Sequence, residues 1–181
     1  MSLAKLLSCV SVMAHGKSYL RTIPMGHFLV ENGNIYGISY LWAALGIGAD
    51  AELYMADVFL GDFHFSLEIA VGGNCTIYIL ENPPITDAGT QLVAYNRRRT
   101  ADAIDYANSL VYRDPTVGVG GVVIHEGFIP GGAGFLRLGG DVTFDNGWIW
   151  DNSANHVVRV TNGSGGAIPV AIRMTGHAAG G

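Results

Sequence analysis

The sequence predicts an all-β fold: an antiparallel β-sandwich, jelly-roll-like, with an irregular N-terminal arm or extension. Short segments of alternating apolar and polar residues follow one another along most of the chain, and turn signals separate them. Hardly any stretch shows the longer apolar period of a helix. The 181 residues suffice for one principal core, so we expect residues 1–25 to form the arm and residues 26–181 the sandwich.

Residues 1–25 and the segment from Ser39 to Ala56 fit this scheme less well than the rest of the chain. Residues 28–38, FLVENGNIYGI, centre on Asn32-Gly33, a dipeptide that tolerates positive φ and therefore predicts a tight turn. The segment from Ser39 to Ala56 is compatible with an arm, a short helix or extra strands. Its apolar run falls short of the ~20 residues that span a bilayer, so no membrane segment is expected. The opening MSLAKLLSCVSVMAHG resembles a secretory leader only superficially, because serines and a cysteine interrupt its apolar run.

The clearest strand is DFHFSLEIAV, residues 62–71, which alternates strictly. CTIYILE resumes the pattern at Cys75. A three-residue loop at 72–74, GGN, brings both apolar faces to the same side, whereas a two-residue turn would place Thr76 and Tyr78 inward. We therefore expect a hairpin with the three-residue loop. Its buried face would carry Phe63, Phe65, Leu67, Ile69 and Val71.

Further strands are expected in the second half of the chain. GVVIHEGFIPGG (121–132), GFLRLGGDVTF (134–144) and GWIWDNSANH (147–156) come first. HVVRVTN (156–162) and AIPVAIRM (167–174) then alternate on either side of a GSGG turn. Proline has no N–H to donate, so Pro169 predicts that the last strand lies at a sheet edge or carries a bulge.

The composition points to an assembly subunit. Charged residues make up 14% of the chain, hydrophobic residues 49%, and 26 residues are glycine. Ordinary soluble domains are roughly 25% charged, so we expect this chain to cover much of its surface with other protein. The net charge of −5 argues against nucleic acid as a general partner. Cys9 and Cys75 form no CxxC pair, so neither a disulfide framework nor a thiolate metal site is expected.

Three consecutive arginines, Arg97, Arg98 and Arg99, stand out because the chain has only ten basic residues. Two interpretations are open. Asp102 and Asp105 could neutralise the arginines within their own loop, through exposed ion pairs worth only ~0–1 kcal/mol. Alternatively, the loop leaves the sandwich and meets an acidic surface on another subunit, which the rarity of charge elsewhere favours.

Enzyme motifs do not emerge. HGKS at 15–18 lacks the glycine that a phosphate loop needs five positions before Gly16, and no GxSxG is present. His64, His125, Glu126 and His156 lie in strand-like segments without the ligand spacing of a jelly-roll oxygenase. We therefore expect no catalytic residue, no metal site and no cofactor; a β-sandwich enzyme or cupin-like metalloprotein is the less favoured alternative, with His125 and Glu126 the first pair to inspect.

Three segments resemble a group of small structural proteins of tailed bacteriophages. They are IYILENPPITDAGTQLVAYNRRRT, GGVVIHEGFIPGGAGFLRLGG and HVVRVTNGSGGAIPVAIRM, and the similarity covers roughly residues 76–175. In that group an ENP…T..GT.L.AYN.NR stretch, a PGG.GF.R.GG stretch and a closing Y..R.TN.SG strand occur in the same order.

Members of this group look like virion proteins, and some resemble capsid decoration (cement) proteins that clamp the lattice from outside. The resemblance thus implies a non-enzymatic capsid decoration protein, assembled in the bacterial host cytoplasm into the virion. Its partners would be the major capsid protein and further copies of itself, as a dimer or trimer, with neither nucleic acid nor membrane. The alternative is a phage tail or fibre module that binds a receptor or glycan.

The contacts are expected in two family-like segments. One is the loop with Arg97, Arg98 and Arg99, and the other is FIPGGAGFLRL at 128–138. Two tryptophans at i and i+2 share one strand face, which is most often a core or subunit contact and otherwise a sugar-stacking platform. Beyond the arginines, the predicted interface residues are Phe128, Ile129, Pro130, Phe135, Arg137, Trp148 and Trp150.

Overall fold

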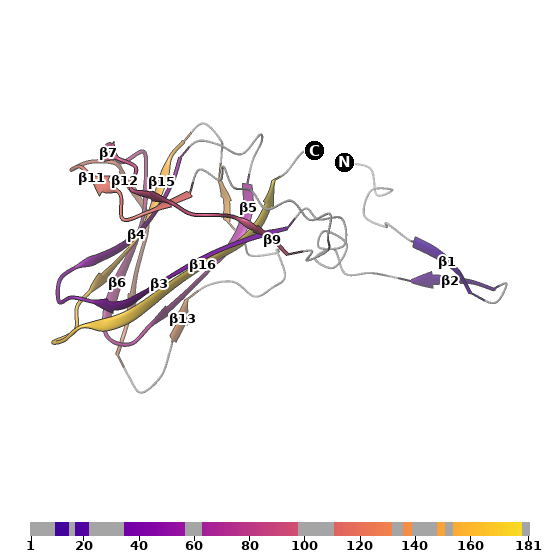
Figure 1. The fold of residues 1–181 in the computed structure, drawn as a ribbon, viewed down its shortest axis with the longest axis horizontal. Coiled ribbons are helices and arrows are strands. Elements are labelled where there is room, and N and C mark those ends of the chain that lie inside the picture. Colours follow the sequence, from indigo (N-terminus) through magenta and orange to yellow (C-terminus); the bar gives the residue numbers. More distant parts are fainter. Residues whose placement is uncertain are drawn as a thin grey trace.

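The structure is a computed structural model that describes residues 10–14, 17–21, 35–56, 63–97, 111–131, 136–138, 148–150 and 154–178 (Figure 1). The regular elements in those ranges are all β-strands, and each paired strand runs antiparallel to its neighbour. The predicted all-β antiparallel fold is therefore confirmed.

Two large sheets form the body of the molecule. Sheet I runs in the order β12 (Val122–Ile129), β6 (Cys75–Glu81), β15 (His156–Asn162), β4 (Asp50–Met55), β10 (Val111–Arg113) and β8 (Thr90–Gln91). Sheet II runs in the order β13 (Leu136–Leu138), β5 (Phe63–Val71), β16 (Ile168–Ala178), β3 (Tyr36–Leu45) and β9 (Tyr95–Asn96), and β14 (Trp148–Trp150) also pairs with β5.

The hydrophobic core lies between these two sheets, where every second residue of each strand points inward. Strand β5 contributes four such side chains, which confirms the predicted buried face for the members whose side chains are described. Strand β6 contributes three more from the opposite sheet. These seven residues, none more than 6% exposed, are Phe65, Leu67, Ile69 and Val71, and Cys75, Ile77 and Ile79.

The loop at 72–74 connects the two sheets and does not close a hairpin. It has the expected three residues, but β5 belongs to sheet II and β6 to sheet I, so the predicted pairing of these strands is wrong. Their apolar faces meet across the core, which satisfies the same alternation. The loop is held by backbone bonds to the neighbouring β15–β16 corner: Gly72 N donates to Pro169 O at 2.9 Å, and Gly163 N to Asn74 O at 2.9 Å.

Two other segments resolve alternatives that the sequence left open. The segment from Ser39 to Ala56 contains most of β3 and all of β4, which lie in different sheets. Pro169 lies in β16, which runs between β5 and β3, so the edge position is wrong. The bulge is correct, since the register of β16 against β3 shifts between Ile168 and Val170.

A smaller apolar cluster covers one end of the outer face of sheet I. Tyr54, Leu80 and Val157 are buried there beneath the short pair β7 (Ile85–Asp87) and β11 (Thr116–Val117), which Figure 1 shows at that end of the sandwich. Tyr54 stacks on Tyr112 with ring centroids 5.8 Å apart. The excursion between β6 and β12 thus folds back onto the sheet from which it leaves.

Near the N-terminus, β1 (Val10–Ala14) and β2 (Lys17–Arg21) pair with each other and with no further described strand. Residues 22–34 lie outside the described residues, and so does the predicted Asn32-Gly33 turn. The boundary between an arm at 1–25 and a sandwich at 26–181 therefore stays a prediction.

Candidate functional site

The first predicted contact, the arginine loop, begins at an outer edge of sheet II. From Val93 to Arg97 the residues alternate: Ala94 and Asn96 are buried, while Val93, Tyr95 and Arg97 are exposed. Tyr95 pairs with Gly37, which faces away from the core. We call Val93, Tyr95 and Arg97 the β9 column; Arg98 and Arg99 lie outside the described residues.

The second predicted contact, at 128–130, is only partly at the surface. Phe128 is 61% exposed and Pro130 is exposed, but Ile129 is 1% exposed and belongs to the core. Placing Ile129 in an interface is therefore wrong. The reason is the alternation of a strand: Phe128 pairs with Thr76 on the outer face of sheet I, so its neighbour Ile129 must point inward beside Cys75.

The remaining predicted contact residues are only partly described. Phe135 lies outside the described residues. Arg137 lies opposite Ala70 in the β13–β5 pair, and Trp148 and Trp150 lie opposite Phe65 and Phe63 in the β14–β5 pair. These registers place the three residues at the β5 side of sheet II. Their side chains are not among those that the structure describes.

An apolar strip follows β12, the last strand of sheet I. Val122 is 59%, Val123 51%, Ile124 36% and Phe128 61% exposed, and the preceding Val119 is fully exposed. We call Val122, Val123, Ile124 and Phe128 the β12 edge. Edge strands of soluble proteins are usually short or carry lysine or proline, because an exposed apolar edge invites association. Val122, Val123 and Ile124 were not among the contact residues predicted from the sequence.

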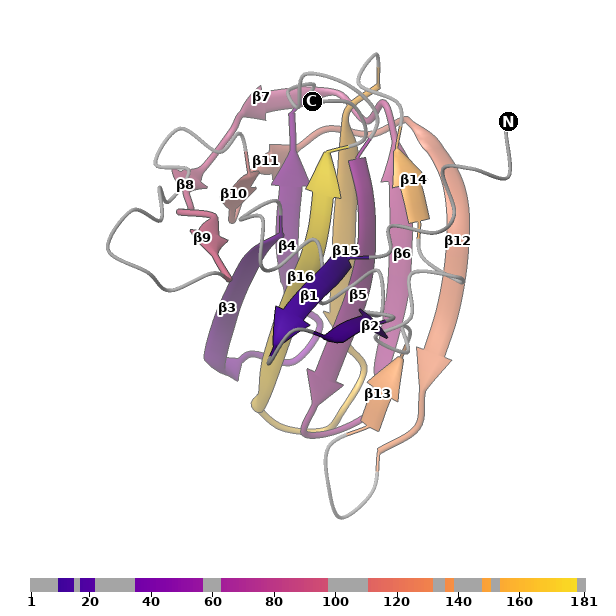
Figure 2. The same ribbon diagram turned by 90° about the vertical axis from the view of Figure 1, so that its right-hand side faces the viewer.

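The β12 edge and the β9 column lie on opposite sides of the sandwich. Figure 2 shows β12 along one lateral edge and β8 and β9 along the other. The structure therefore does not bring the two predicted contact segments together into one site. Instead it presents two separate surfaces, each of which can face a different neighbour.

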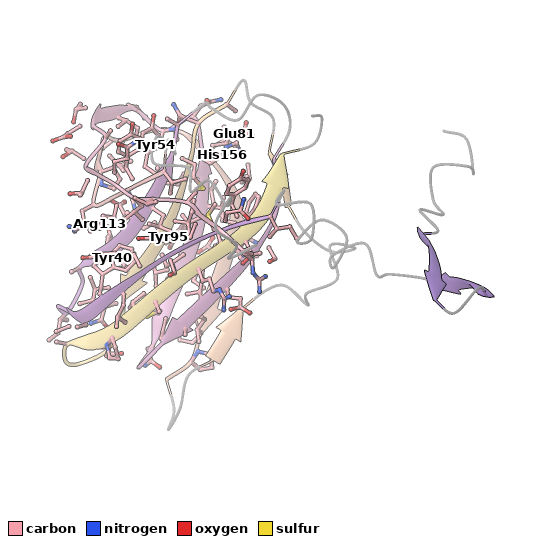
Figure 3. The ribbon with its side chains drawn as sticks, turned by 45° about the vertical axis from the view of Figure 1, so that its right-hand side comes forward. Tyr40, Tyr54, Glu81, Tyr95, Arg113 and His156 are labelled. Atoms are coloured by element: carbon pink, nitrogen blue, oxygen red, sulfur yellow. The ribbon has the colours of Figure 1, made fainter. Side chains whose placement is uncertain are left out.

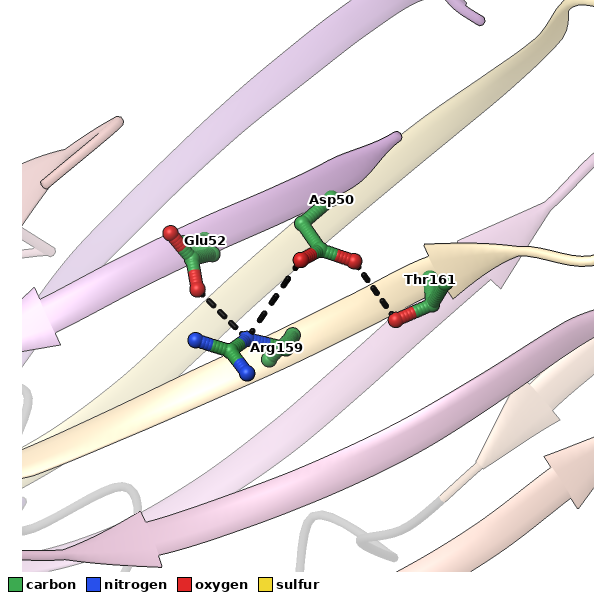
Figure 4. A network of polar contacts seen from close by, with 4 residues as sticks. All are labelled: Asp50, Glu52, Arg159 and Thr161. Carbon is green, nitrogen blue, oxygen red and sulfur yellow. Dashed lines mark hydrogen bonds and ion pairs between the residues drawn. The ribbon is translucent and has the colours of Figure 1, made fainter. Parts of the chain in front are cut away.

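A polar network on the outer face of sheet I was not anticipated from the sequence. Arg159 Nε donates to Glu52 Oε1 at 2.6 Å and lies 3.6 Å from Asp50 Oδ2, while Thr161 Oγ1 donates to Asp50 Oδ1 at 2.6 Å (Figure 4). The contacts follow from the pairing of β15 with β4, in which Arg159 lies opposite Glu52 and Thr161 lies opposite Asp50. The network sets one cation, Arg159, against two carboxylates, Glu52 and Asp50.

Burial dominates the protonation of Glu52 in that network. The residue is 8% exposed, and desolvation raises the pKa of its carboxyl group above the ordinary value. The hydrogen bond and charge of Arg159 act in the opposite direction without cancelling that effect. Asp50 and Asp114, as nearby negative charges, add to the rise.

A second polar cluster closes the sandwich between β3 and β10. The Arg113 guanidinium lies 4.5 Å from the centroid of the Tyr40 ring and 2.5 Å from Asp114 Oδ2 (Figure 3). Trp42 Nε1 donates to Asp114 Oδ1 at 2.7 Å, and the Tyr40 and Trp42 rings meet edge to face at 4.8 Å. Asp114 thus accepts from both Trp42 and Arg113, and the cluster links β3 to the end of β10.

Several residues of the phage-like segments hold the fold together. Asn162 is 1% exposed, and its Nδ2 donates to the carbonyls of Leu45, Gly46 and Gly166 at 2.9, 3.0 and 2.9 Å. Gly89 has φ +84°, and a Cβ there would meet the carbonyl oxygen of Arg113. These residue types are therefore required by a corner and a turn of the fold.

The histidines and carboxylates weighed as metal ligands do not converge in the part of the chain described. His125 points toward the core side of β12 and Glu126 toward solvent, since they are adjacent in one strand. His156 is 3% exposed, with Nε2 3.6 Å from Glu81 Oε2. Among the described residues, no group of three or more histidines, cysteines or carboxylates is arranged to hold a metal ion.

Comparison with known proteins adds no family: no protein-family model, no curated protein and no solved structure matches this chain. Within the described ranges, no helix has the length and apolar character needed to cross a membrane.

Proposed function

We propose that this protein is a structural component of a tailed-bacteriophage virion: a capsid decoration protein, without enzymatic activity, that binds the outer capsid surface and stabilises capsomer junctions. The observation that carries the proposal is the presence of exposed apolar surface on both lateral edges of a sandwich whose chain is only 14% charged. Exposed apolar surface of this kind usually marks a contact with other protein.

The form of the sandwich supports the proposal. Most of the longer strands alternate between the sheets along the chain: β3, β5 and β16 lie in sheet II, whereas β4, β6 and β15 lie in sheet I. Such alternation is compatible with a jelly roll, in which paired strands wrap around a common axis. Jelly rolls are frequent in viral capsid proteins, and the resemblance over residues 76–175 points in the same direction.

The mechanism we propose is mechanical. A standard protein contact buries about 800 Å² on each partner, and apolar burial contributes roughly 25 cal/mol per Å² before the costs of ordering. A copy that spans a junction between capsomers adds this free energy to the work of separating them. Because the shell repeats each junction many times, the contributions act together against the pressure of packaged DNA.

The low charge is compatible with that arrangement. Closely spaced copies with a high net charge would repel one another over distances comparable to the Debye length of ~8 Å. In the described ranges, several of the charged groups are already paired, as in the Arg159 network and the Arg113–Asp114 contact. Neighbouring copies can then approach without a large electrostatic cost.

The test is the number of copies per particle. We expect quantitative mass spectrometry of purified virions to find hundreds of copies, in proportion to the major capsid protein. Virions that lack the protein should release their DNA at a lower temperature than complete virions, and adding purified protein back should restore the difference. A few dozen copies would instead place the protein in the tail, as the receptor-binding alternative requires, and absence from virions would contradict both.

A further inference from the structure

The two lateral edges of the sandwich carry residues of complementary character. On β12 the outward-facing residues Val123, Glu126 and Phe128 form one column, which lies opposite Leu80, Tyr78 and Thr76 of β6. On the other side, the β9 column consists of Val93, Tyr95 and Arg97. Each column therefore contains a valine, an aromatic ring and one exposed charge, and the two charges have opposite signs.

Neither charge is neutralised by a described neighbour. In the ranges that the structure describes, no ion pair includes Glu126 or Arg97. Arg159, in the strand beyond β6, is already engaged by Glu52 at 2.6 Å. The Arg97 side chain lies across Gly37, with its Cγ 4.0 Å from the position that a Cβ on that glycine would take. Among the described residues, neither charge has an ion-pair partner that would compete with a second copy.

We propose that the β12 column of one copy docks against the β9 column of a second copy, with Glu126 facing Arg97 and the apolar residues burying each other. The columns lie on opposite edges, so a copy cannot satisfy its own (Figure 2). A contact between two different surfaces is heterologous, and it leaves a free column at each end of a pair. Addition of further copies therefore continues, either as an open chain or until the copies close into a ring.

The positions of the columns allow repeated addition of copies. The β12 column faces outward from sheet I, and the β9 column faces outward from sheet II, so the two columns face in opposite directions. Copies related mainly by translation would form an open chain, and copies related by a rotation that closes would form a ring. The inference does not depend on the proposed capsid role, because it concerns the purified protein alone.

The contact is made by side chains and not by continuing the sheet. The register of β12 against β6 shifts between Val123 and His125, which marks a bulge. Bulges bend and twist an edge strand and interrupt its ladder of free backbone groups. On the opposite side, β9 spans only Tyr95–Asn96. A long run of strand-to-strand hydrogen bonds between copies is therefore disfavoured, and the specificity resides in the charge pair.

Charge reversal tests the pairing directly. Light scattering coupled to size exclusion should show the wild type as a multiple of the 19.1 kDa chain at tens of micromolar. Glu126→Arg and Arg97→Glu should each weaken association at least 10-fold, because each places like charges together. The double variant should associate within about 3-fold of the wild type, since it restores an opposite pair in the reversed orientation. Circular dichroism should be unchanged, as both positions are exposed.

Mixing the single variants adds a test of the pairing between different columns. Glu126→Arg copies and Arg97→Glu copies should associate weakly alone, but in a mixture they should alternate and assemble, with even numbers of copies if a ring closes. A monomeric wild type would overturn the inference and leave the columns to a different partner. Weaker association of Glu126→Arg without weaker association of Arg97→Glu would also overturn it, because that result would indicate a symmetric β12–β12 contact. A double variant that associates no better than the single variants would overturn it as well. None of these outcomes bears on the copy number per virion.

Discussion

Of the polar substitutions predicted for this fold, Asn162→Ala should lower the free energy of unfolding the most. Its two N–H groups serve three carbonyl oxygens, and its Oδ1 accepts from Ser164 N at 2.8 Å. Asn162→Ala removes these bonds and leaves the buried Leu45 carbonyl without this donor. At ~1 kcal/mol for each ordinary bond and about 1–3 kcal/mol for a buried group left unpaired, we expect a loss of roughly 3–5 kcal/mol.

Such a loss is a large share of the ~5–15 kcal/mol by which a domain is normally stable. The backbone of Asn162 keeps its own bonds, from its N–H to Ala49 O and from Gly48 N to its carbonyl, so the variant should retain the corner and fold more weakly. Urea unfolding followed by circular dichroism and tryptophan fluorescence measures the difference. The matched control is Thr161→Ala, which removes one exposed bond to Asp50 and should cost under ~1 kcal/mol.

The prediction is contradicted if Asn162→Ala lowers the free energy of unfolding by no more than the Thr161→Ala control does. That result would mean that water replaces the side chain at the corner, and that the asparagine of the VTNGSGG segment is not a structural requirement. A loss accompanied by a smaller denaturant slope would instead mean that the native corner opens, because that slope reports the surface exposed on unfolding. The cost would then be shared between the lost bonds and a less compact native state.

Three further predictions address other parts of the fold. Folding raises the pKa of Glu52, so the stability that its protonated form contributes is fully present below the ordinary pKa and is lost as pH rises through the folded value. The free energy of unfolding of the wild type, measured relative to Glu52→Gln, should therefore fall as pH rises from about 4 toward 7. A rise over the same range would contradict this prediction. Gly89→Ala should lower that free energy by more than ~1 kcal/mol because of its positive φ and close backbone contacts, while Gly165→Ala, with nothing within 4 Å, should stay within ~0.5 kcal/mol in the same urea titration. Ile129→Ala should cost about 2–5 kcal/mol, whereas Phe128→Ala should leave the melting temperature nearly unchanged and weaken association; equal effects on folding would refute the assignment of one residue to the core and the other to the surface.

Alternation was sufficient to predict which residues face the core. The pattern of residues 63–71 gave the inward set correctly for Phe65, Leu67, Ile69 and Val71, because a strand buried on one face has no other way to separate its apolar side chains from water. The all-β class followed for the same reason. Neither inference needs knowledge of which strand pairs with which.

The sequence did not predict which strands pair with each other. Two strands joined by a three-residue loop can lie side by side in one sheet or face each other across a core, and both arrangements turn Ile69 and Ile77 inward. The choice depends on long-range contacts. Gly72 bonds to Pro169, nearly a hundred residues away in sequence, and the bulge at that proline is part of the same corner. No local pattern contains this information.

The predicted contact segments differ from the structure in two respects. It treated residues 128–130 as one exposed segment, although neighbours in a strand face opposite ways, so Ile129 could not share a surface with Phe128. It also treated the two phage-like segments as equivalent contacts, and only the sheet order reveals that β12 and β9 lie on opposite edges.

The polar residues of the phage-like segments and the exposed apolar residues have different roles in this molecule. Asn162 is buried and fixes a corner, and Gly89 permits a turn that a residue with a side chain would adopt only with strain. Residues fixed by such requirements are not available to recognise a partner. What the sandwich offers to a neighbour is the surface between these fixed points, namely the apolar β12 edge and the β9 column. A protein that recognised a small polar ligand would need convergent polar groups left unpaired, and the described clusters around Arg159 and Arg113 pair theirs internally. The two exposed surfaces are the ones that the proposed contacts with other protein would use.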